Sequence, residues 1–275
     1  MQFGSLPPDI TDPKKAKAVI IPAPYGGALS FMPGTENAPQ KILEVSKELE
    51  PYDEELGDIW KAGIHTQDPL ELSEDPEEAI NTVYEAVKKT DKFPILLGGG
   101  HSLSIGAAKA LSEKHDTLSV LQLDAHADLY DKFDNSTTSH ACTMSRIREF
   151  APYVGIGLRS LSFEGSELIK NENIPVFWAR DIYNNSGWHD EAIEKLTDNV
   201  YITLDVDAFD PSIMTTGTPE PGGLYYYQTL EFLKKVFQQK NVVGFDIMEY
   251  RPTDDPAPAM LLVRLIYKLL GYKFI

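Results

Sequence analysis

The chain has little cysteine and no long apolar run, and both absences limit what it can be. Its 275 residues include a single cysteine, Cys142, so an intramolecular disulfide framework is excluded. The first eight residues, Met-Gln-Phe-Gly-Ser-Leu-Pro-Pro, lack the basic and apolar regions of a signal peptide. No uninterrupted apolar run approaches the roughly 18 residues that a membrane helix needs. We therefore expect a soluble cytoplasmic protein with no membrane partner, in which Cys142 is a buried, unreactive thiol.

Basic residues are also scarce. Lys and Arg total 25 against 42 Asp and Glu, which gives a formal net charge of −17 and a pI of about 4.7. A surface of this sign repels nucleic acid and anionic membranes, so neither is expected as a partner. It attracts divalent metal ions and small cationic substrates. With no repeat and no linker-like tract, residues 1–275 are expected to form one α/β domain.

Apolar runs of strand length alternate with helical patterns along the chain. We expect strands over residues 18–22, 93–97, 118–123, 153–157, 200–204 and 242–247. We expect helices over residues 39–49, 77–90, 103–114, 142–150, 190–197, 229–239 and 257–270. This alternation predicts a mainly parallel sheet with helices on both faces. Two long segments without such patterns, residues 129–139 and 209–223, are expected to be functional loops.

Polar side chains follow four of these strands where each strand ends. They are His101; Asp124, His126 and Asp128; Asp205 and Asp207; and Glu249. In open parallel sheets, ligands bind outside the carboxyl ends of the strands, so we expect these side chains to meet there. In an extended chain, residues two apart face the same way. We therefore expect the three residues of the second cluster to share one side, and the two of the third cluster likewise.

Carboxylates and imidazoles without thiolate favour Mn²⁺, Fe²⁺ or Zn²⁺. Six candidates are too many for one catalytic ion with an open position, and they suit two ions roughly 3.5–4 Å apart. The ligand candidates are His101, Asp124, His126, Asp128, Asp205 and Asp207. Their four aspartates carry a charge that two divalent ions cancel, and a bridging hydroxide would leave a centre matched to a singly cationic substrate. Without metal, the clustered carboxylates would repel one another.

The sequence resembles the ureohydrolases, the arginase and agmatinase family, over nearly its whole length. The resemblance is carried by Gly98-Gly-Gly-His101, Asp124-Ala-His-Ala-Asp128, Ser139-His140, Asp205-Val-Asp207-Ala-Phe-Asp210-Pro211, Gly217-Thr-Pro-Glu-Pro-Gly-Gly223 and Phe245-Asp-Ile-Met-Glu249. It implies one ureohydrolase catalytic domain with a three-layer α/β/α fold around a mostly parallel eight-stranded sheet. It also implies two Mn²⁺ per chain, hydrolysis of a guanidino group to urea and an amine, and a homotrimer or homohexamer.

The same resemblance implies roles for individual residues. His101, Asp124, Asp128 and Asp205 would hold one or both metal ions, and His126 and Asp207 would complete the pair. His140 would transfer a proton, and Glu249 would engage the guanidinium. Chemistry is consistent with these roles, since a carboxylate can accept two guanidinium N–H groups and a histidine titrates near neutral pH.

Substrate choice is expected to depend on the loop after Asp128. Arginase-like enzymes carry an Asn two residues after this Asp and a Ser-Gly-Asn-x-His-Gly run, whereas here Tyr130 and Thr137-Thr-Ser-His140-Ala141 stand in those places. The Ser-His-Ala-Cys version is similar to that of prokaryotic agmatinases, and Asp131 and Asp134 would favour a cationic tail. We therefore predict hydrolysis of agmatine to urea and putrescine. Arginine, 4-guanidinobutyrate and N1-aminopropylagmatine stay open as alternatives.

Two functions other than ureohydrolysis are compatible with part of this residue set. A deacetylase-like metal amidohydrolase would use a single zinc ion, which six ligand candidates argue against. A catalytically silent homologue would lack a ligand, His140 or Glu249, and none is lacking. Three further histidines, His65, His115 and His189, lie in polar sequence, where we expect solvated rings.

Overall fold

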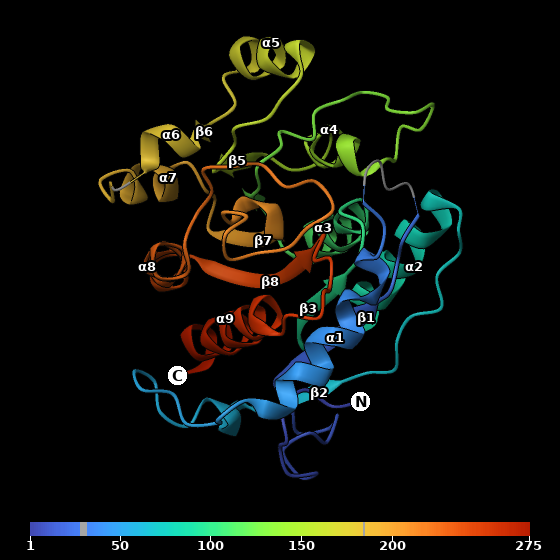
Figure 1. The fold of residues 1–275 in the computed structure, drawn as a ribbon, viewed down its shortest axis with the longest axis vertical. Coiled ribbons are helices and arrows are strands. Elements are labelled where there is room, and N and C mark those ends of the chain that lie inside the picture. Colours follow the sequence, from blue (N-terminus) through green and yellow to red (C-terminus); the bar gives the residue numbers. More distant parts are fainter. Residues whose placement is uncertain (28–31, 184) are drawn as a thin grey trace.

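The protein is built on one eight-stranded sheet in which every strand pair is parallel (Figure 1). The computed structural model describes residues 1–27, 32–183 and 185–275. The strand order is β2-β1-β3-β8-β7-β4-β5-β6. The strands are β1 (Ala18–Ala23), β2 (Ile64–Thr66), β3 (Phe93–Gly98), β4 (Leu118–Leu123), β5 (Tyr153–Ile156), β6 (Val176–Phe177), β7 (Asn199–Asp205) and β8 (Asn241–Met248).

Helices follow most of the strands. The α-helices are α1 (Ala38–Val45), α2 (Pro76–Lys89), α3 (Leu103–Lys114), α4 (Thr143–Ile147), α5 (Phe163–Glu172), α6 (Ala179–Ile182), α7 (His189–Glu194), α8 (Tyr226–Gln239) and α9 (Ala257–Phe274). Short 3₁₀ helices span Thr35–Asn37, Ser46–Glu48, Ile59–Ala62, His140–Cys142 and Val206–Ala208. The predicted helix over residues 39–49 is thus α1 continued by a 3₁₀ turn, and the one predicted over 142–150 is shorter than expected.

The strands are apolar on both faces, which creates two cores. On β7, Ile202 and Leu204 belong to a core covered by α1, α7, α8 and α9, whereas Tyr201 belongs to a core covered by α2, α3 and α4. Figure 1 shows α8 and α9 on one side of the sheet and α2 and α3 on the other. Burial of both faces is what a fully parallel sheet requires. The three-layer α/β/α fold is confirmed.

A sequence signal explains where α2 begins. Asp75 precedes α2, its Oδ1 accepts hydrogen bonds from the backbone N–H groups of Glu77 and Glu78, and Pro76 occupies the first helical position.

His189 was expected to be solvated, but it begins α7 and is buried between Trp188 and Phe232. The helix expected over residues 190–197 thus begins one residue earlier, at His189, whose ring packs inward.

The four strands that end in the polar clusters are the central strands β3, β8, β7 and β4. The chain leaves β3, passes through α3 and returns as β4 on the far side of β8 and β7. Sheets of this kind bind ligands at such crossing points. The cluster after β3 is placed by Gly99, where a Cβ atom would lie 1.9 Å from the carbonyl oxygen of Tyr25. Only glycine permits this close approach.

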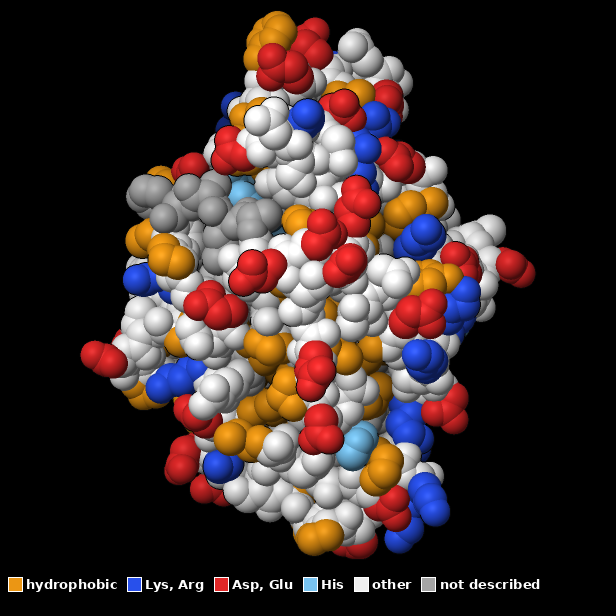
Figure 2. Space-filling view, turned by 90° about the vertical axis from the view of Figure 1, so that its right-hand side faces the viewer, with side chains coloured by type: hydrophobic (Ala, Val, Ile, Leu, Met, Phe, Trp, Pro, Cys, Tyr) orange, Lys and Arg blue, Asp and Glu red, His pale blue; other side chains and the backbone are white. Residues whose placement is uncertain are grey.

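The surface charge agrees with the excess of acidic residues in the sequence. Figure 2 shows acidic side chains spread over one face of the molecule, with Lys and Arg side chains gathered mainly toward the margins of the view. Within the part of the chain that the structure describes, no helix combines the length and apolar character required to cross a membrane.

Candidate metal centre

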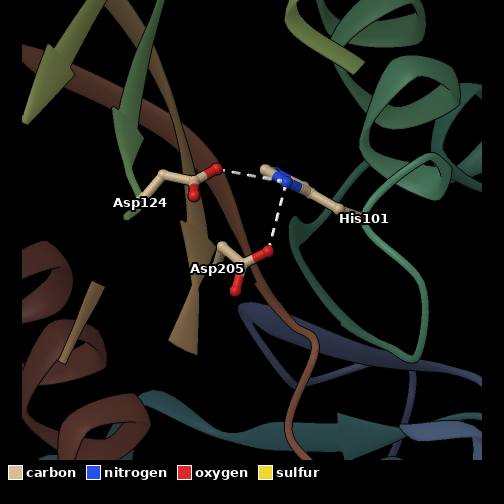
Figure 3. Close-up of side chains that lie close together, drawn as sticks. All are labelled: His101, Asp124 and Asp205. Carbon is tan, nitrogen blue, oxygen red and sulfur yellow. Dashed lines mark ion pairs between the residues drawn. The ribbon is translucent and has the colours of Figure 1, made fainter. Parts of the chain in front are cut away.

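Three carboxylates surround one ring nitrogen of His101. His101 Nδ1 lies 3.0 Å from Asp128 Oδ2, 3.3 Å from Asp205 Oδ2 and 3.4 Å from Asp124 Oδ2. All four side chains are buried. Figure 3 shows His101 entering from the end of β3 and Asp124 and Asp205 from neighbouring strands, with their polar atoms converging. We call His101, Asp124, Asp128 and Asp205 the His101 group.

A second set of donors adjoins the first. His126 Nδ1 lies 2.8 Å from Asp207 Oδ2 and 3.8 Å from Asp124 Oδ1. We call Asp124, His126 and Asp207 the His126 group. Asp124 belongs to both groups, because its Oδ2 faces His101 while its Oδ1 faces His126. In each of the sets His101–Asp124–Asp205 and Asp124–His126–Asp207, the ligand atoms lie within 4.8 Å of one another.

The local conformation differs from the simple alternation expected after β4 and β7. The chain is irregular after β4, and Asp128 adopts φ 50°, which turns its side chain toward His101 while His126 faces Asp207. After β7 the chain enters a 3₁₀ turn, and the Asp207 N–H donates to Asp205 Oδ1 at 3.0 Å. His126 and Asp128 therefore join different groups, and so do Asp205 and Asp207, whereas Asp124 and His126 share one. His126, Asp128, Asp205 and Asp207 nevertheless line one cavity, although strict alternation holds only while the strand continues.

The electrostatics of the two groups favour the binding of cations. Burial and the neighbouring carboxylates, Asp207 foremost, raise the pKa values of Asp124 and Asp205 well above their usual range. Burial works to raise the pKa of Asp207, but the hydrogen bond with His126 lowers it to about 2. Burial works to lower the pKa of His126, but Asp207 raises it to about 9. A donor set of carboxylates and imidazoles at this density fits hard or borderline divalent ions.

Glu249 follows directly after β8 and reaches the same edge of the sheet. Its backbone has φ 62°, a left-handed conformation that is uncommon for a residue with a side chain. The Glu249 N–H donates to the carbonyl oxygen of Gly99 at 2.8 Å, and Glu249 Oε1 accepts the backbone N–H of His101 at 2.7 Å. Burial raises the pKa of the Glu249 carboxyl to about 7. The carboxylate is thus held in a fixed orientation beside the His101 group.

His140 begins the 3₁₀ turn that closes the loop after Asp128. Its ring lies edge-on to Phe133 at a centroid distance of 5.9 Å, and Phe133 in turn lies 5.3 Å from the ring of Tyr130. Phe133 is held by a tight turn, in which it exchanges two 2.9 Å backbone hydrogen bonds with Ser136. The structure therefore brings His140 into the same cavity as Glu249.

A cavity of about 220 Å³ opens beside the metal-ligand candidates. Its lining includes no lysine or arginine among the described residues. The lining residues are His126, Ala127, Asp128, Leu129, Tyr130, Phe133, His140, Ala141, Ser160, Leu161, Ser162, Gly165, Asp205, Asp207, Thr218 and Glu249. Both long loops predicted to be functional thus contribute to its wall.

Three contributors were missed at the sequence level. Gln122 Nε2 donates to Asp124 Oδ2 at 2.9 Å, and Thr218 Oγ1 donates to Asp207 Oδ2 at 3.2 Å. Arg159 donates to the backbone carbonyl oxygens of Asp207 and Glu220 at 2.7 and 2.8 Å, which fixes the segment after β7. The sequence does contain a feature that could have identified Gln122, since it is a polar residue in an apolar strand, two positions before a ligand candidate. For Arg159 it contains no such feature.

The fold and the donor set define a class of α/β proteins that can hold two divalent metal ions at the carboxyl edge of a parallel sheet. Comparisons with known proteins identify the family. A sequence profile of the arginase family matches residues 16–271. The N(1)-aminopropylagmatine ureohydrolase of Synechocystis sp. is 38% identical over 278 residues, which cover 96% of this chain and 91% of that protein.

Two further relatives agree. The agmatinase of Pyrococcus horikoshii is 36% identical over 247 residues, which cover 86% of this chain and 85% of that protein. The crystal structure of the agmatine ureohydrolase of Thermoplasma volcanium has a TM-score of 0.87 at 29% identity and covers 94% of this chain and 90% of that one. The chain belongs to the arginase family, and it is a ureohydrolase.

Proposed function

We propose that this chain, as one catalytic domain, hydrolyses the guanidino group of a linear cationic amine, with N1-aminopropylagmatine as the first candidate substrate and agmatine as the second. The products are urea and the corresponding polyamine. The observation that carries the proposal is the cavity in which Glu249, His140 and both donor groups meet and whose described lining residues include no lysine or arginine.

The residues present fit two divalent ions. His101, Asp128 and Asp205 would hold one ion, His126 and Asp207 the other, and Asp124 faces both groups with separate oxygens. A single-zinc arrangement, as in a deacetylase-like enzyme, would leave one donor group unused. When bound, the two ions, which we infer to be Mn²⁺, would supply water activation near neutral pH and would compensate the buried carboxylates.

Glu249 is suited to hold the guanidinium. A guanidinium is planar, permanently cationic and rich in N–H donors, so a buried carboxylate is its natural partner. Glu249 Oε1 already accepts the His101 N–H at 2.7 Å, which fixes the plane of the carboxylate before substrate arrives. Substrate binding therefore needs little reordering of this side chain.

His140 is suited to deliver a proton. Water adds to the guanidino carbon, the bond from that carbon to the alkyl-bearing nitrogen breaks, and the departing amine must be protonated. His140 lines the cavity, and its ring is positioned by Phe133 and by Ser139 Oγ, 3.4 Å from His140 Nδ1. A positioned histidine is the commonest general acid in such a step.

The cavity favours an amine tail over a carboxylate tail. A substrate carboxylate would meet a lining that includes Glu249, Asp128 and Asp205 but no lysine or arginine among the described residues, and leaving it unpaired would cost several kcal/mol. An ammonium can instead lie against the rings of Tyr130 and Phe133, which favour cations over their faces. Asp131 contributes less to this preference than expected, because it forms an ion pair with Arg146 at 2.6 Å.

The longer substrate is preferred on two grounds. The Synechocystis protein, 38% identical to this chain, is named an N(1)-aminopropylagmatine ureohydrolase. The cavity lining also includes Ser160 and Ser162, whose hydroxyl oxygens would accept N–H groups of a second amine. The agmatine activity expected from the sequence stays a prediction, as do the homotrimeric or homohexameric state and the cytoplasmic location.

The test is urea release from a panel of guanidino compounds under one Mn²⁺-loaded condition. We expect kcat/KM to fall in the order N1-aminopropylagmatine, agmatine, then 4-guanidinobutyrate and arginine, with a gap on the order of 10²-fold or more before the carboxylate-bearing compounds. If kcat/KM for agmatine exceeds that for N1-aminopropylagmatine, agmatine becomes the first candidate substrate. Arginine turnover equal to that of both amines would contradict the proposed tail selectivity.

A further inference from the structure

A chain of buried polar groups lies behind His101, on the side away from the carboxylates. His101 Nε2 lies 2.9 Å from Thr203 Oγ1, and Thr203 Oγ1 lies 3.0 Å from Asp246 Oδ1. The Tyr201 hydroxyl donates to Asp246 Oδ2 at 2.5 Å. These four side chains are fully or almost fully buried.

The sheet brings these groups together. Tyr201, Thr203 and Asp205 are alternate residues of β7, so they share one face of the sheet. Thr203 and Asp246 are direct partners in the parallel pairing of β7 with β8. Ser104, in the first turn of α3, adds a hydroxyl 3.1 Å from Thr203 Oγ1.

Asp246 is an unusual residue for its place. It lies inside β8, 0% exposed, and the donors described around it are the neutral hydroxyls of Tyr201, Thr203 and Ser104 and the backbone N–H of Leu204. A buried carboxylate without a cationic partner is costly, so its retention inside an apolar layer calls for a reason.

The donor pattern fixes the direction of the hydrogen bonds. A carboxylate only accepts, so the Thr203 hydroxyl donates its single proton to Asp246. The Thr203 oxygen then accepts a hydrogen bond from the N–H at His101 Nε2. A ring protonated at Nε2 presents the Nδ1 lone pair, and Nδ1 is the atom that faces Asp124, Asp128 and Asp205. A metal ligand must present this lone pair.

We propose that Thr203 and Asp246 are positioning residues that fix the ring orientation and the tautomer of His101 for metal binding. This inference rests on the proposed function, because it assumes that the His101 group holds a metal ion. It concerns only this ion, because the described hydrogen bonds of Thr203 and Asp246 lead to His101 and not to His126.

The experiment compares Mn²⁺ affinity in three variants of the full chain. Thr203→Val keeps the size of the side chain but removes the hydroxyl, and with it the hydrogen bonds to His101, Asp246 and Ser104. Thr203→Ser keeps the hydroxyl and is the conservative rescue. Tyr201→Phe removes a buried hydrogen bond to Asp246 without touching His101, so it is the matched control for a purely structural effect. Affinities are measured by competition with a chelator, and folding of each metal-free variant is checked by its melting curve.

We expect Thr203→Val to weaken one of the two Mn²⁺ sites about 10–100-fold and to leave the other unchanged. Thr203→Ser and Tyr201→Phe should keep both affinities near those of the unaltered chain, although Tyr201→Phe should lower the melting temperature. An equal loss of Mn²⁺ affinity in Thr203→Val and Tyr201→Phe would overturn the inference, and so would unchanged Mn²⁺ affinity in Thr203→Val.

Asp246→Asn provides a second route if Thr203→Val does not fold, because an amide can donate to the Thr203 oxygen and reverse the chain. It should weaken the same single site, and unchanged affinity would count against the inference. Failure of the proposed function is recognised separately. If the proposed function is wrong, the unaltered chain itself takes up fewer than two Mn²⁺. If only this inference is wrong, the unaltered chain binds two Mn²⁺, and Thr203→Val or Asp246→Asn binds them with the same affinities.

Discussion

The backbone N–H of His101 donates a 2.7 Å hydrogen bond to Glu249 Oε1 across 148 residues of sequence. This contact joins the segment between β3 and α3 to the residue that follows β8, and β3 and β8 are neighbours in the sheet. It couples the position of a proposed metal ligand to that of the proposed guanidinium partner. A shift of either strand end would therefore disturb both functions together.

The charge of Glu249 is expected to matter more than its shape. Glu249→Gln keeps an oxygen for the His101 N–H but weakens two charge-assisted hydrogen bonds to the guanidinium. At about 1.5–3 kcal/mol each, kcat/KM should fall on the order of 10²–10⁴-fold. The measurement is urea release, with circular dichroism to check the fold. Glu164→Gln, at an exposed position on α5, is the control and should leave kcat/KM unchanged. A Glu249→Gln enzyme with normal kcat/KM would rule out this role.

Two metal ions per chain are expected at saturation. Removing them with a chelator should abolish activity and lower the melting temperature, because an ion at 100 times its Kd adds about 2.7 kcal/mol of stability per site. Asp128→Ala or Asp205→Ala should disable catalysis almost completely. Elemental analysis gives the stoichiometry, and Asp116→Asn, at an exposed position, is the control. One ion per active chain at saturation would contradict the two-ion prediction.

Proton transfer by His140 is expected to be helpful but not indispensable. His140→Asn should lower kcat about 10²–10⁴-fold, the usual contribution of one general acid or base. Metal content should not change, because His140 belongs to neither donor group. Rates are compared between pH 7 and 9. Full activity of the variant throughout that range would require another proton donor.

Acid stability is expected to depend on Asp53, far from the metal centre. Lys268 Nζ on α9 lies 2.8 Å from Asp53 Oδ1, and both side chains are buried. Burial works to raise the pKa of Asp53, but hydrogen bonds from Lys268 and from the backbone of Leu56 and Glu55 lower it overall. A lowered pKa means that the contribution is complete above the unfolded pKa of about 3.9 and is lost as pH falls through the folded value.

Asp53→Asn should therefore cost about 1–3 kcal/mol at neutral pH. The difference in free energy of unfolding from the unaltered chain should shrink below about pH 4. Urea unfolding of both metal-free proteins from pH 3 to pH 7 measures it. A difference that stays constant down to pH 3 would show that the charge of Asp53 is not the source.

The secondary structure was predictable where an element is long and periodic. The expected bounds of α3 and β4 are those of the structure, and the bounds of the other five expected strands are within one residue at each end. The edge strands β2 and β6 were missed because two or three residues cannot establish an alternation. Helix α5 was also missed, because only Gly165 and Ile169 of its residues are buried and its apolar pattern is weak.

The sequence by itself determined which residues meet at the carboxyl edge of the sheet, because each apolar run ends directly before its polar cluster and parallel strands end together. It also determined the family, through the spacing inside each cluster. Only the tertiary structure decided how the donors divide. Asp128 joins His101 through a positive φ, Asp124 faces both groups, and Asp205 and Asp207 separate at a 3₁₀ turn. Strand order placed Asp246 and Thr203 behind His101, and pairing between β7 and β8 cannot be read from either segment alone. These features arise from contacts between residues distant in sequence, which local patterns do not encode.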